Sequence, residues 1–171
     1  MAIDPREMET LALLGARGVA YTRYEHAPAR TMEDCENIGA EVGARHFKNL
    51  FLTNRQNTAF YLLLIGADKK FRTAEVSKQL GTSRLSFGSD AQLMEKLGLL
   101  PGSVTPMALA HPGAREVTVV IDRDILFMDL VCVHPCVATA SLARAWADVY
   151  AFIESFGNPV ALVTIAAADA N

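Results

Sequence analysis

The sequence has few cysteines and no long apolar stretch, and each shortage excludes a class of protein. Three cysteines in 171 residues are an odd number and do not make a disulfide framework. No stretch reaches the roughly 18 uncharged apolar residues that a transmembrane helix needs, and the apolar tail from residue 159 onward is also too short. The N-terminal stretch carries charges where a signal peptide has its apolar region. We therefore expect a cytoplasmic protein with no membrane partner.

Strong net charge, repeats and flexible linkers are also lacking. A net charge of −3 argues against a protein that coats nucleic acid, and we expect no DNA partner. No repeat, low-complexity tract or long Pro/Gly linker interrupts the chain. With 171 residues, 51% of them hydrophobic, the chain is long enough to bury a substantial core. We expect a single domain over residues 1–171, with a core at about 5–157 and a short C-terminal extension.

Positive charge is concentrated in one part of the chain. Residues 45–84 hold eight Lys or Arg side chains against two acidic ones, which makes +6 here and, from a total of −3, leaves −9 elsewhere. A basic segment on an acidic body suits local binding of phosphate groups. Solvated side chains that merely cluster in the sequence explain the charge equally well.

Capping signals and helical periodicity predict the helices. Asp4 followed by Pro5 marks one helix start, Thr31 with Asp34 resembles a capping box, and Ser89 marks a third start. The expected helices cover about residues 5–15, 31–39, 73–81, 89–97 and 143–157. The last has an apolar stripe formed by Trp146, Val149, Tyr150 and Ile153.

Apolar and alternating runs predict the strands. The expected strands cover about residues 19–26, 47–54, 58–66, 107–111, 116–122, 129–136 and 137–142. The second and third are separated by "RQN" and predict a hairpin of buried strands. Connections between strands are often too short for parallel crossovers. The sequence therefore predicts an α+β fold with a mixed, mostly antiparallel sheet.

A C-x-H-x-C pattern near the end of the chain raises two chemical alternatives. Strand alternation places Cys132, His134 and Cys136 on one face, and their side chains are suitable zinc ligands. However, no fourth ligand is obvious and Pro135 interrupts the strand. Two buried cysteines that behave as small hydrophobes are the better account. A cysteine nucleophile, Cys35 or Cys136 with a histidine base, stays open.

Three other features carry chemistry only if they meet in one pocket. The loop "GSVTP", Gly102 to Pro106, combines a glycine with small polar residues, so its backbone N–H groups can face an anion or a carbonyl oxygen. His134 can donate or accept a proton near neutral pH. Lys48 and Asn49 stand just before an apolar run. Taken singly, these features are an ordinary turn, a structural histidine and the edge of a strand.

Three stretches together carry a family resemblance: "FKNLFL" at 47–52, "GSVTP" at 102–106 and "CVHPCVATASL" at 132–142. With "YEHAPARTMED" before them and "KQLGTSRLSF" between them, the chain resembles the free-standing relatives of the bacterial prolyl-tRNA synthetase editing domain, the YbaK family. The resemblance covers about residues 5–157. "KNLFLTNR" and "LGTSRLSF" are typical of the ProX-type prolyl-tRNA editing branch.

The resemblance implies hydrolysis of the ester in mischarged Ala-tRNA(Pro), in trans, without a metal or cofactor. It also implies a sheet curved around a pocket and surrounded by helices. The implied partners are the tRNA(Pro) acceptor end carrying a small amino acid and, further, prolyl-tRNA synthetase. Two alternatives stay open: a deacylase for Cys- or Ser-tRNA(Pro), and a non-catalytic module that captures aminoacyl ends.

The family motifs fall on particular residues of this sequence. The motif lysine and the late histidine fall on Lys48 and His134, the expected catalytic residues. The expected substrate-binding residues are Asn49, Gly102, Ser103, Pro106 and Thr139. Relatives commonly have an Asn-Thr-rich run after the "HP" motif, whereas this chain has "CVATASL", in which Thr139 is the remaining polar candidate.

Overall fold

The computed structural model describes residues 2–29 and 31–167, and its larger sheet has five strands in the order β4-β2-β3-β5-β8. These strands are β2 (Phe47–Thr53), β3 (Phe60–Gly66), β4 (Ser86–Phe87), β5 (Val117–Asp122) and β8 (Val160–Val163). β2 pairs antiparallel with β3 and β4, whereas β5 is parallel to both β3 and β8. The predicted hairpin at 47–66 is confirmed.

A smaller sheet of three strands has the order β1-β7-β6 and is antiparallel throughout. Its strands are β1 (Thr22–Glu25), β6 (Leu130–Val133) and β7 (Ala140–Ala145). A parallel bridge between Arg45 and Val131 joins its edge to the residues just before β2. The fold is α+β with mixed, mostly antiparallel pairing, as predicted, but the strands form two sheets linked at this bridge.

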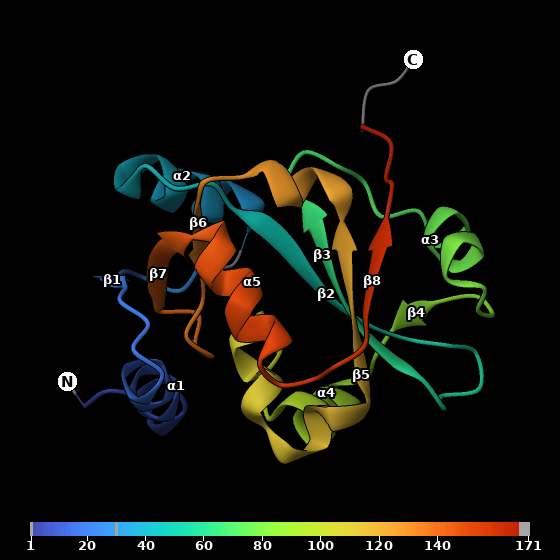
Figure 1. The fold of residues 1–171 in the computed structure, drawn as a ribbon, viewed down its shortest axis with the longest axis horizontal. Helices are drawn as coiled ribbons and strands as arrows, with labels where there is room; N and C mark the ends of the chain where they lie inside the picture. The colour runs from blue at the N-terminus through green and yellow to red at the C-terminus, as the bar shows by residue number, and fades with distance from the viewer. Residues whose placement is uncertain (1, 30, 168–171) are drawn as a thin grey trace.

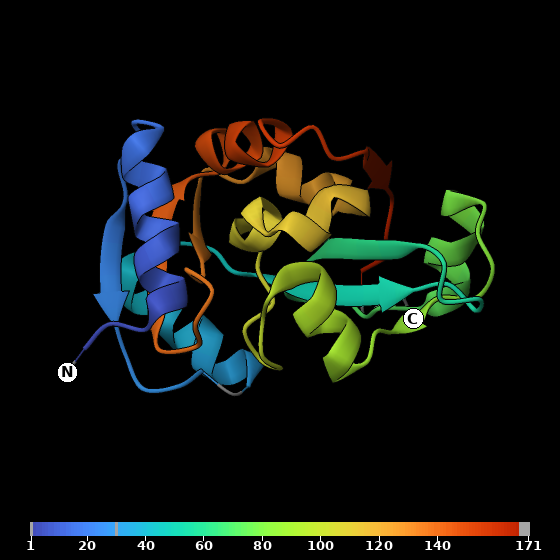
Figure 2. The same cartoon turned by 90° about the horizontal axis from the view of Figure 1, so that it is seen from below.

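Helices surround the two sheets. They are α1 (Pro5–Ala16), α2 (Met32–Val42), α3 (Thr73–Leu80), α4 (Asp90–Leu97) and α5 (Trp146–Glu154). Three 3-10 helices follow loops or strands: η1 (Pro106–Ala110), η2 (Pro112–Glu116) and η3 (Arg123–Phe127). Figures 1 and 2 show α1 beside the smaller sheet at one end of the molecule and α3 beside β4 and β8 at the other.

The capping predictions are confirmed. The Asp4 carboxylate accepts a hydrogen bond from the Arg6 N–H, and Thr31 with Asp34 forms a reciprocal capping box. The Ser89 hydroxyl accepts from the backbone of Gln92, and α3 ends at Gly81 in the left-handed conformation. These local signals coincide with four of the helix boundaries.

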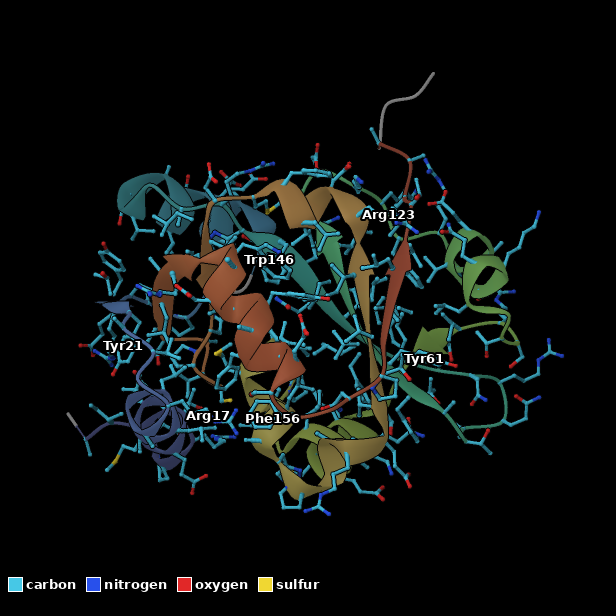
Figure 3. The ribbon with its side chains drawn as sticks, in the orientation of Figure 1. Arg17, Tyr21, Tyr61, Arg123, Trp146 and Phe156 are labelled. Atoms are coloured by element: carbon cyan, nitrogen blue, oxygen red, sulfur yellow. The ribbon has the colours of Figure 1, made fainter. Side chains whose placement is uncertain are left out.

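The core is divided by the larger sheet, whose central strands are covered on both faces. Leu62 and Leu64 of β3 belong to the main cluster, whereas Leu63 and Ile65 belong to a second cluster on the opposite face. Burial on both faces explains why β3 is a continuous apolar run. Trp146, at the start of α5 in Figure 3, lies in the main cluster, and its ring centroid is 5.9 Å from that of Phe47.

The prediction of a strand at 107–111 is wrong, because this segment forms η1. Pro106 stands in the first turn of η1, where its fixed φ favours a helical start, and the Thr105 hydroxyl accepts from the Met107 N–H at 3.3 Å. The apolar run is buried as a helical turn rather than as a strand.

The expected boundaries near the C-terminus also change. Ala143–Ala145 extend β7 and pair with β1 and β6, so the helix predicted from residue 143 begins only at Trp146. Phe152 is buried on this helix, while Tyr150 is half-buried. After the expected core end at residue 157, Val160–Val163 form the edge strand β8. Within the described ranges, no helix has both the length and the apolarity to cross a bilayer.

Candidate functional site

A pocket of about 350 Å³ opens where the segment of β2 separates from β6. The Arg45 N–H donates to the Leu130 carbonyl and the Cys132 N–H donates to the Arg45 carbonyl, each at 2.9 Å. β4 covers the edge of β2 only at Leu52 and Thr53. The edge from residue 47 to residue 50 is therefore available to line a pocket. The lining residues are Ala29, Thr31, Cys35, His46, Phe47, Lys48, Asn49, Leu50, Gly102, Val104, Cys132 and His134.

The pocket brings together four of the predicted residues from distant parts of the chain: Lys48, Asn49, Gly102 and His134. Three others do not line it. Ser103 and Pro106 are buried, and Thr139 is exposed, with its backbone carbonyl accepting from the His26 N–H. Direct contact with a ligand in this pocket is thus favoured for the first four.

Lys48 and Asn49 reach the pocket along the uncovered edge of β2. Alternation places their side chains on opposite faces of the strand. The Lys48 ammonium donates a hydrogen bond to the backbone carbonyl of Lys69. The Asn49 side-chain oxygen is buried without a hydrogen-bond partner among the described residues. An amide oxygen of this kind can accept a hydrogen bond from a ligand donor.

The loop from residue 102 to 105 is bonded to His134, the residue that follows β6. The Thr105 hydroxyl donates to the backbone carbonyl of His134 at 2.7 Å, and the Ser103 N–H donates to the Leu100 carbonyl at 3.2 Å. Gly102 has φ +87°, which a side chain rarely adopts, although an added Cβ would meet nothing within 4 Å. The backbone conformation, rather than crowding, therefore requires glycine here.

His134 is buried and its ring is oriented by a backbone group. Nδ1 lies 3.2 Å from the Ala140 carbonyl and donates to it, which leaves Nε2 as the acceptor. Burial lowers the pKa of His134; the bond to Ala140 opposes this shift and the nearby His26 adds to it. The imidazole is therefore neutral at pH 7 and can accept a proton or a hydrogen bond.

The sequence-based predictions missed His26 and His46. The rings of His26 and His134 are 6.4 Å apart, and His46 lines the pocket two residues before Lys48. Burial lowers the pKa of His46 to about 4, with further contributions from His134 and His26. A Cβ on Gly39 would lie 2.7 Å from the His46 Nδ1, so α2 can pack against this ring only with glycine there. Both histidines lie within or beside the motif stretches, but only the fold shows their proximity.

Cys132 and Cys136 are buried, as the interpretation of small hydrophobes predicts, whereas Cys35 is half-buried. Cys132 lines the main pocket, whereas Cys136 lines a separate pocket of about 170 Å³ and its sulfur accepts from the Thr10 hydroxyl at 3.2 Å. Burial raises the pKa of Cys132 to about 11 and also raises that of Cys35 and Cys136. Protonated thiols are poor nucleophiles, which argues against cysteine catalysis. Among the described residues, no group of three or more His, Cys, Asp or Glu side chains is arranged to hold a metal ion.

The model of the aminoacyl-tRNA editing domain family matches residues 26–152 of the sequence. The chain belongs to this family. All four pocket residues predicted from the sequence lie inside the matched range.

Individual relatives refine the place of the chain within the editing family. The prolyl-tRNA editing protein ProX of Acetoanaerobium sticklandii is 30% identical over 158 residues, 92% of this chain and 96% of that protein. A proline–tRNA ligase of Methylobacillus flagellatus is 35% identical over 105 residues, 57% of this chain and 18% of that enzyme. The resemblance to free-standing editing proteins of the ProX type is confirmed.

A solved structure supports the fold. It is described as a candidate trans-editing enzyme for prolyl tRNA synthetase and superposes with a TM-score of 0.74, at 19% identity, covering 96% of this chain and 100% of that one. At this identity the likeness concerns the fold alone.

Proposed function

We propose that this editing-family protein acts in the cytoplasm as a trans-editing deacylase that hydrolyses the ester of mischarged Ala-tRNA(Pro). The observation that carries the proposal is the convergence of Lys48, Asn49, Gly102 and His134 in one pocket. An aminoacyl ester is already activated. A positioned water, a pocket for the amino-acid side chain and stabilisation of the oxyanion therefore suffice for hydrolysis.

Lys48 is assigned to the phosphate of the terminal adenosine. Its ammonium has three donors, and one of them is used by the Lys69 carbonyl. The other two can hold phosphate oxygens, and a lysine does this as a compact point charge. The contact would set the register of the tRNA end along the edge of β2.

The remaining pocket residues are assigned to the ester. The backbone at Gly102 would hold the carbonyl group, while His134 and Asn49 would orient the water or a ribose hydroxyl. No Asp or Glu is among the described residues that line the pocket. We therefore assign activation of the water to the ribose hydroxyl of the tRNA itself, with the neutral His134 imidazole as a hydrogen-bond partner.

Selection against proline is assigned to the size of the pocket. Part of its lining is apolar, as at Ala29, Phe47 and Val104, which suits a methyl group. One or two extra methylenes change binding by only about 1–3 kcal/mol when they merely fit less well. A wall that clashes with the pyrrolidine ring would discriminate more strongly.

Discrimination against correct Ala-tRNA(Ala) must come from the tRNA. The basic segment 45–84 does not form one surface at the pocket, because Arg55 follows β2 at its far end, roughly 20 Å from Lys48 at the rise of a strand. Lys69 is buried and ion-paired. The acceptor-stem contacts are therefore assigned to Arg45 and Lys70, which are exposed neighbours of the pocket segments. Prolyl-tRNA synthetase is a proposed further partner.

A panel of labelled Ala-, Ser-, Cys- and Pro-tRNA(Pro) tests the proposal. We expect Ala-tRNA(Pro) to be deacylated fastest and Pro-tRNA(Pro) to be spared. Equal hydrolysis of Pro-tRNA(Pro) would contradict an editing role, and faster hydrolysis of the Ser or Cys ester would favour those substrates instead. Tight tRNA binding without deacylation at micromolar protein would favour a non-catalytic binding module.

A metal-independent reaction is also part of the proposal. Activity is expected to survive a strong chelator, and elemental analysis of the active protein is expected to show no stoichiometric metal. Loss of activity with the chelator and recovery with Zn²⁺ would contradict this part.

A further inference from the structure

The Lys48 ammonium is held by a turn that follows β3. It donates to the backbone carbonyl of Lys69, and the Lys69 N–H closes the turn by donating to the Gly66 carbonyl at 3.0 Å. The position of the Lys69 carbonyl therefore determines the position of the Lys48 ammonium.

The turn itself is fixed by a buried ion pair. The Lys69 side chain is 6% exposed, and its Nζ lies 2.8 Å from Oδ1 of Asp122, a side chain that is 1% exposed. The other Asp122 oxygen accepts from the Gly66 N–H at 3.0 Å. One carboxylate at the end of β5 therefore holds both ends of the turn. In Figure 1 the segment after β3 and the turn η3 after β5 lie at the same end of the sheet, and Figure 3 labels Arg123, which follows Asp122.

The atoms around Gly66 in this turn are closely packed. A Cβ on Gly66 would lie 3.3 Å from the Asp122 and Asp68 carboxylate oxygens and 3.4 Å from the Lys69 side chain. A second carboxylate, Asp124, lies 2.7 Å from the Lys69 Nζ but is 70% exposed. The two acidic partners of Lys69 thus differ in burial, which makes Asp124 a matched control for Asp122.

Stability alone is a weak reason for burying such a pair. Desolvation offsets much of the attraction between buried charges, and apolar replacements are often as stable. Burial lowers the pKa of Lys69, but hydrogen bonds and charges from Asp122 and Asp124 outweigh this and raise it overall, so the Lys69 ammonium stays charged. What the pair supplies to the pocket is a fixed carbonyl beside Lys48.

We propose that Lys69 and Asp122 are positioning residues, whose buried ion pair fixes the Lys69 carbonyl and so holds the Lys48 ammonium ready for phosphate. The inference rests on the proposed function, in which Lys48 binds the phosphate of the tRNA end. A lysine has a long flexible stem, and holding its head in place before binding lowers the entropy lost when the ligand arrives.

A double-mutant cycle tests the link to Lys48. Asp122→Asn and the charge-free pair Lys69→Met/Asp122→Asn are made in the wild type and in Lys48→Ala, and kcat/KM for Ala-tRNA(Pro) is measured. In the wild type we expect a loss of about 10- to 100-fold, mainly in KM, since misplacing a group by about 1 Å can cost that much. In the Lys48→Ala background the same changes should have no further effect. Equal losses in both backgrounds would show a general structural role and overturn the inference.

Asp124→Asn is the control, because it removes the exposed partner and leaves the buried pair. It should stay within about twofold of the wild type, as exposed pairs contribute little. Unfolding curves measured on every variant show that the assays compare folded proteins.

Chemical labelling separates failure of this inference from failure of the proposed function. Trace labelling with acetic anhydride, read by mass spectrometry of peptides, reports the reactivity of the Lys48 amine without any tRNA. Asp122→Asn should raise Lys48 labelling about tenfold, since the bond from its charged donor is weakened, and Asp124→Asn should not. Unchanged Lys48 labelling in Asp122→Asn overturns the positioning role even if the protein is an active deacylase. A wild type that deacylates no substrate in the panel refutes the proposed function, while the labelling still decides the positioning role.

Discussion

The two walls of the pocket differ in how they treat positive charge. On the wall formed by β2, Lys48 keeps its ammonium against a backbone carbonyl, and the buried Lys69 behind it is ionised beside Asp122. On the histidine wall, which we define as His134 after β6 and His46 just before β2, burial and neighbouring imidazoles lower the pKa of both rings. Among the described lining residues, positive charge is therefore carried by Lys48 and not by His46 or His134.

This asymmetry matches a ligand that is charged at one end and neutral at the other. A phosphate needs a cation, whereas an ester and its attacking water need groups that accept or donate without attracting a second anion. Two cationic walls would bind phosphate in more than one orientation. The difference between the walls thus supports one register for the tRNA end in the proposed reaction.

Removing the Lys48 ammonium should have the largest effect on deacylation activity. Lys48→Ala is expected to lower kcat/KM for Ala-tRNA(Pro) by about 10- to 100-fold, because a hydrogen bond to a charged group contributes about 1.5–3 kcal/mol. Lys78→Ala, which removes an exposed lysine of α3, is the control and should change little. Activity of Lys48→Ala within a few-fold of the wild type would contradict the phosphate-binding role of Lys48.

Changing the backbone conformation at Gly102 should have the second-largest effect on activity. Gly102→Ala forces a side chain into a left-handed conformation and should cost about 1–2 kcal/mol of folding stability and roughly tenfold in kcat/KM. Gly157→Ala is a matched control, since Gly157 also has positive φ with open space at its Cβ but does not line the pocket. Chemical denaturation should show similar losses for both variants, whereas deacylation should fall only for Gly102→Ala. An equal fall in both would mean that activity follows stability alone.

The histidine wall should make the protein less stable in acid. The folded-state pKa of His46, about 4, is below its ordinary value of 6.5, so the unfolded chain binds the proton more tightly. Stability is therefore retained above pH 6.5 and falls by roughly 1–3 kcal/mol as the pH drops toward 4. Urea unfolding at a series of pH values should show a shallower fall for His46→Asn than for the wild type. Identical slopes would contradict a neutral, buried His46.

The smallest effect is expected at Thr139. This residue is exposed and is not among the lining residues of the pocket, so we expect the binding role predicted for it from the sequence to contribute little. Thr139→Ala should leave kcat/KM within about twofold, as surface substitutions usually change free energies by less than 0.5 kcal/mol. A tenfold loss of kcat/KM in the deacylation assay would instead indicate that Thr139 contacts the substrate when it is bound.

Local patterns predicted the elements well where a single short-range cause operates. Two apolar runs and a three-residue connection predicted the β2–β3 hairpin, and Thr31 with Asp34 predicted the start of α2. The segment 107–111 failed because its apolar residues have no period that separates a strand from a 3-10 turn. Ala143–Ala145 failed because pairing with two neighbouring strands overrode helical propensity.

The sequence by itself determined the family, the helix starts, the hairpin and the types of residue the site requires, because motifs and caps act over a few neighbouring positions. Only the tertiary structure decided which of those residues share a pocket. It also decided that His46 lines the same pocket as Lys48, and that Lys69 is ion-paired with Asp122, 53 positions along the chain. The physical reason is that burial and pKa depend on neighbours brought together by sheet pairing, which spacing along the chain does not specify.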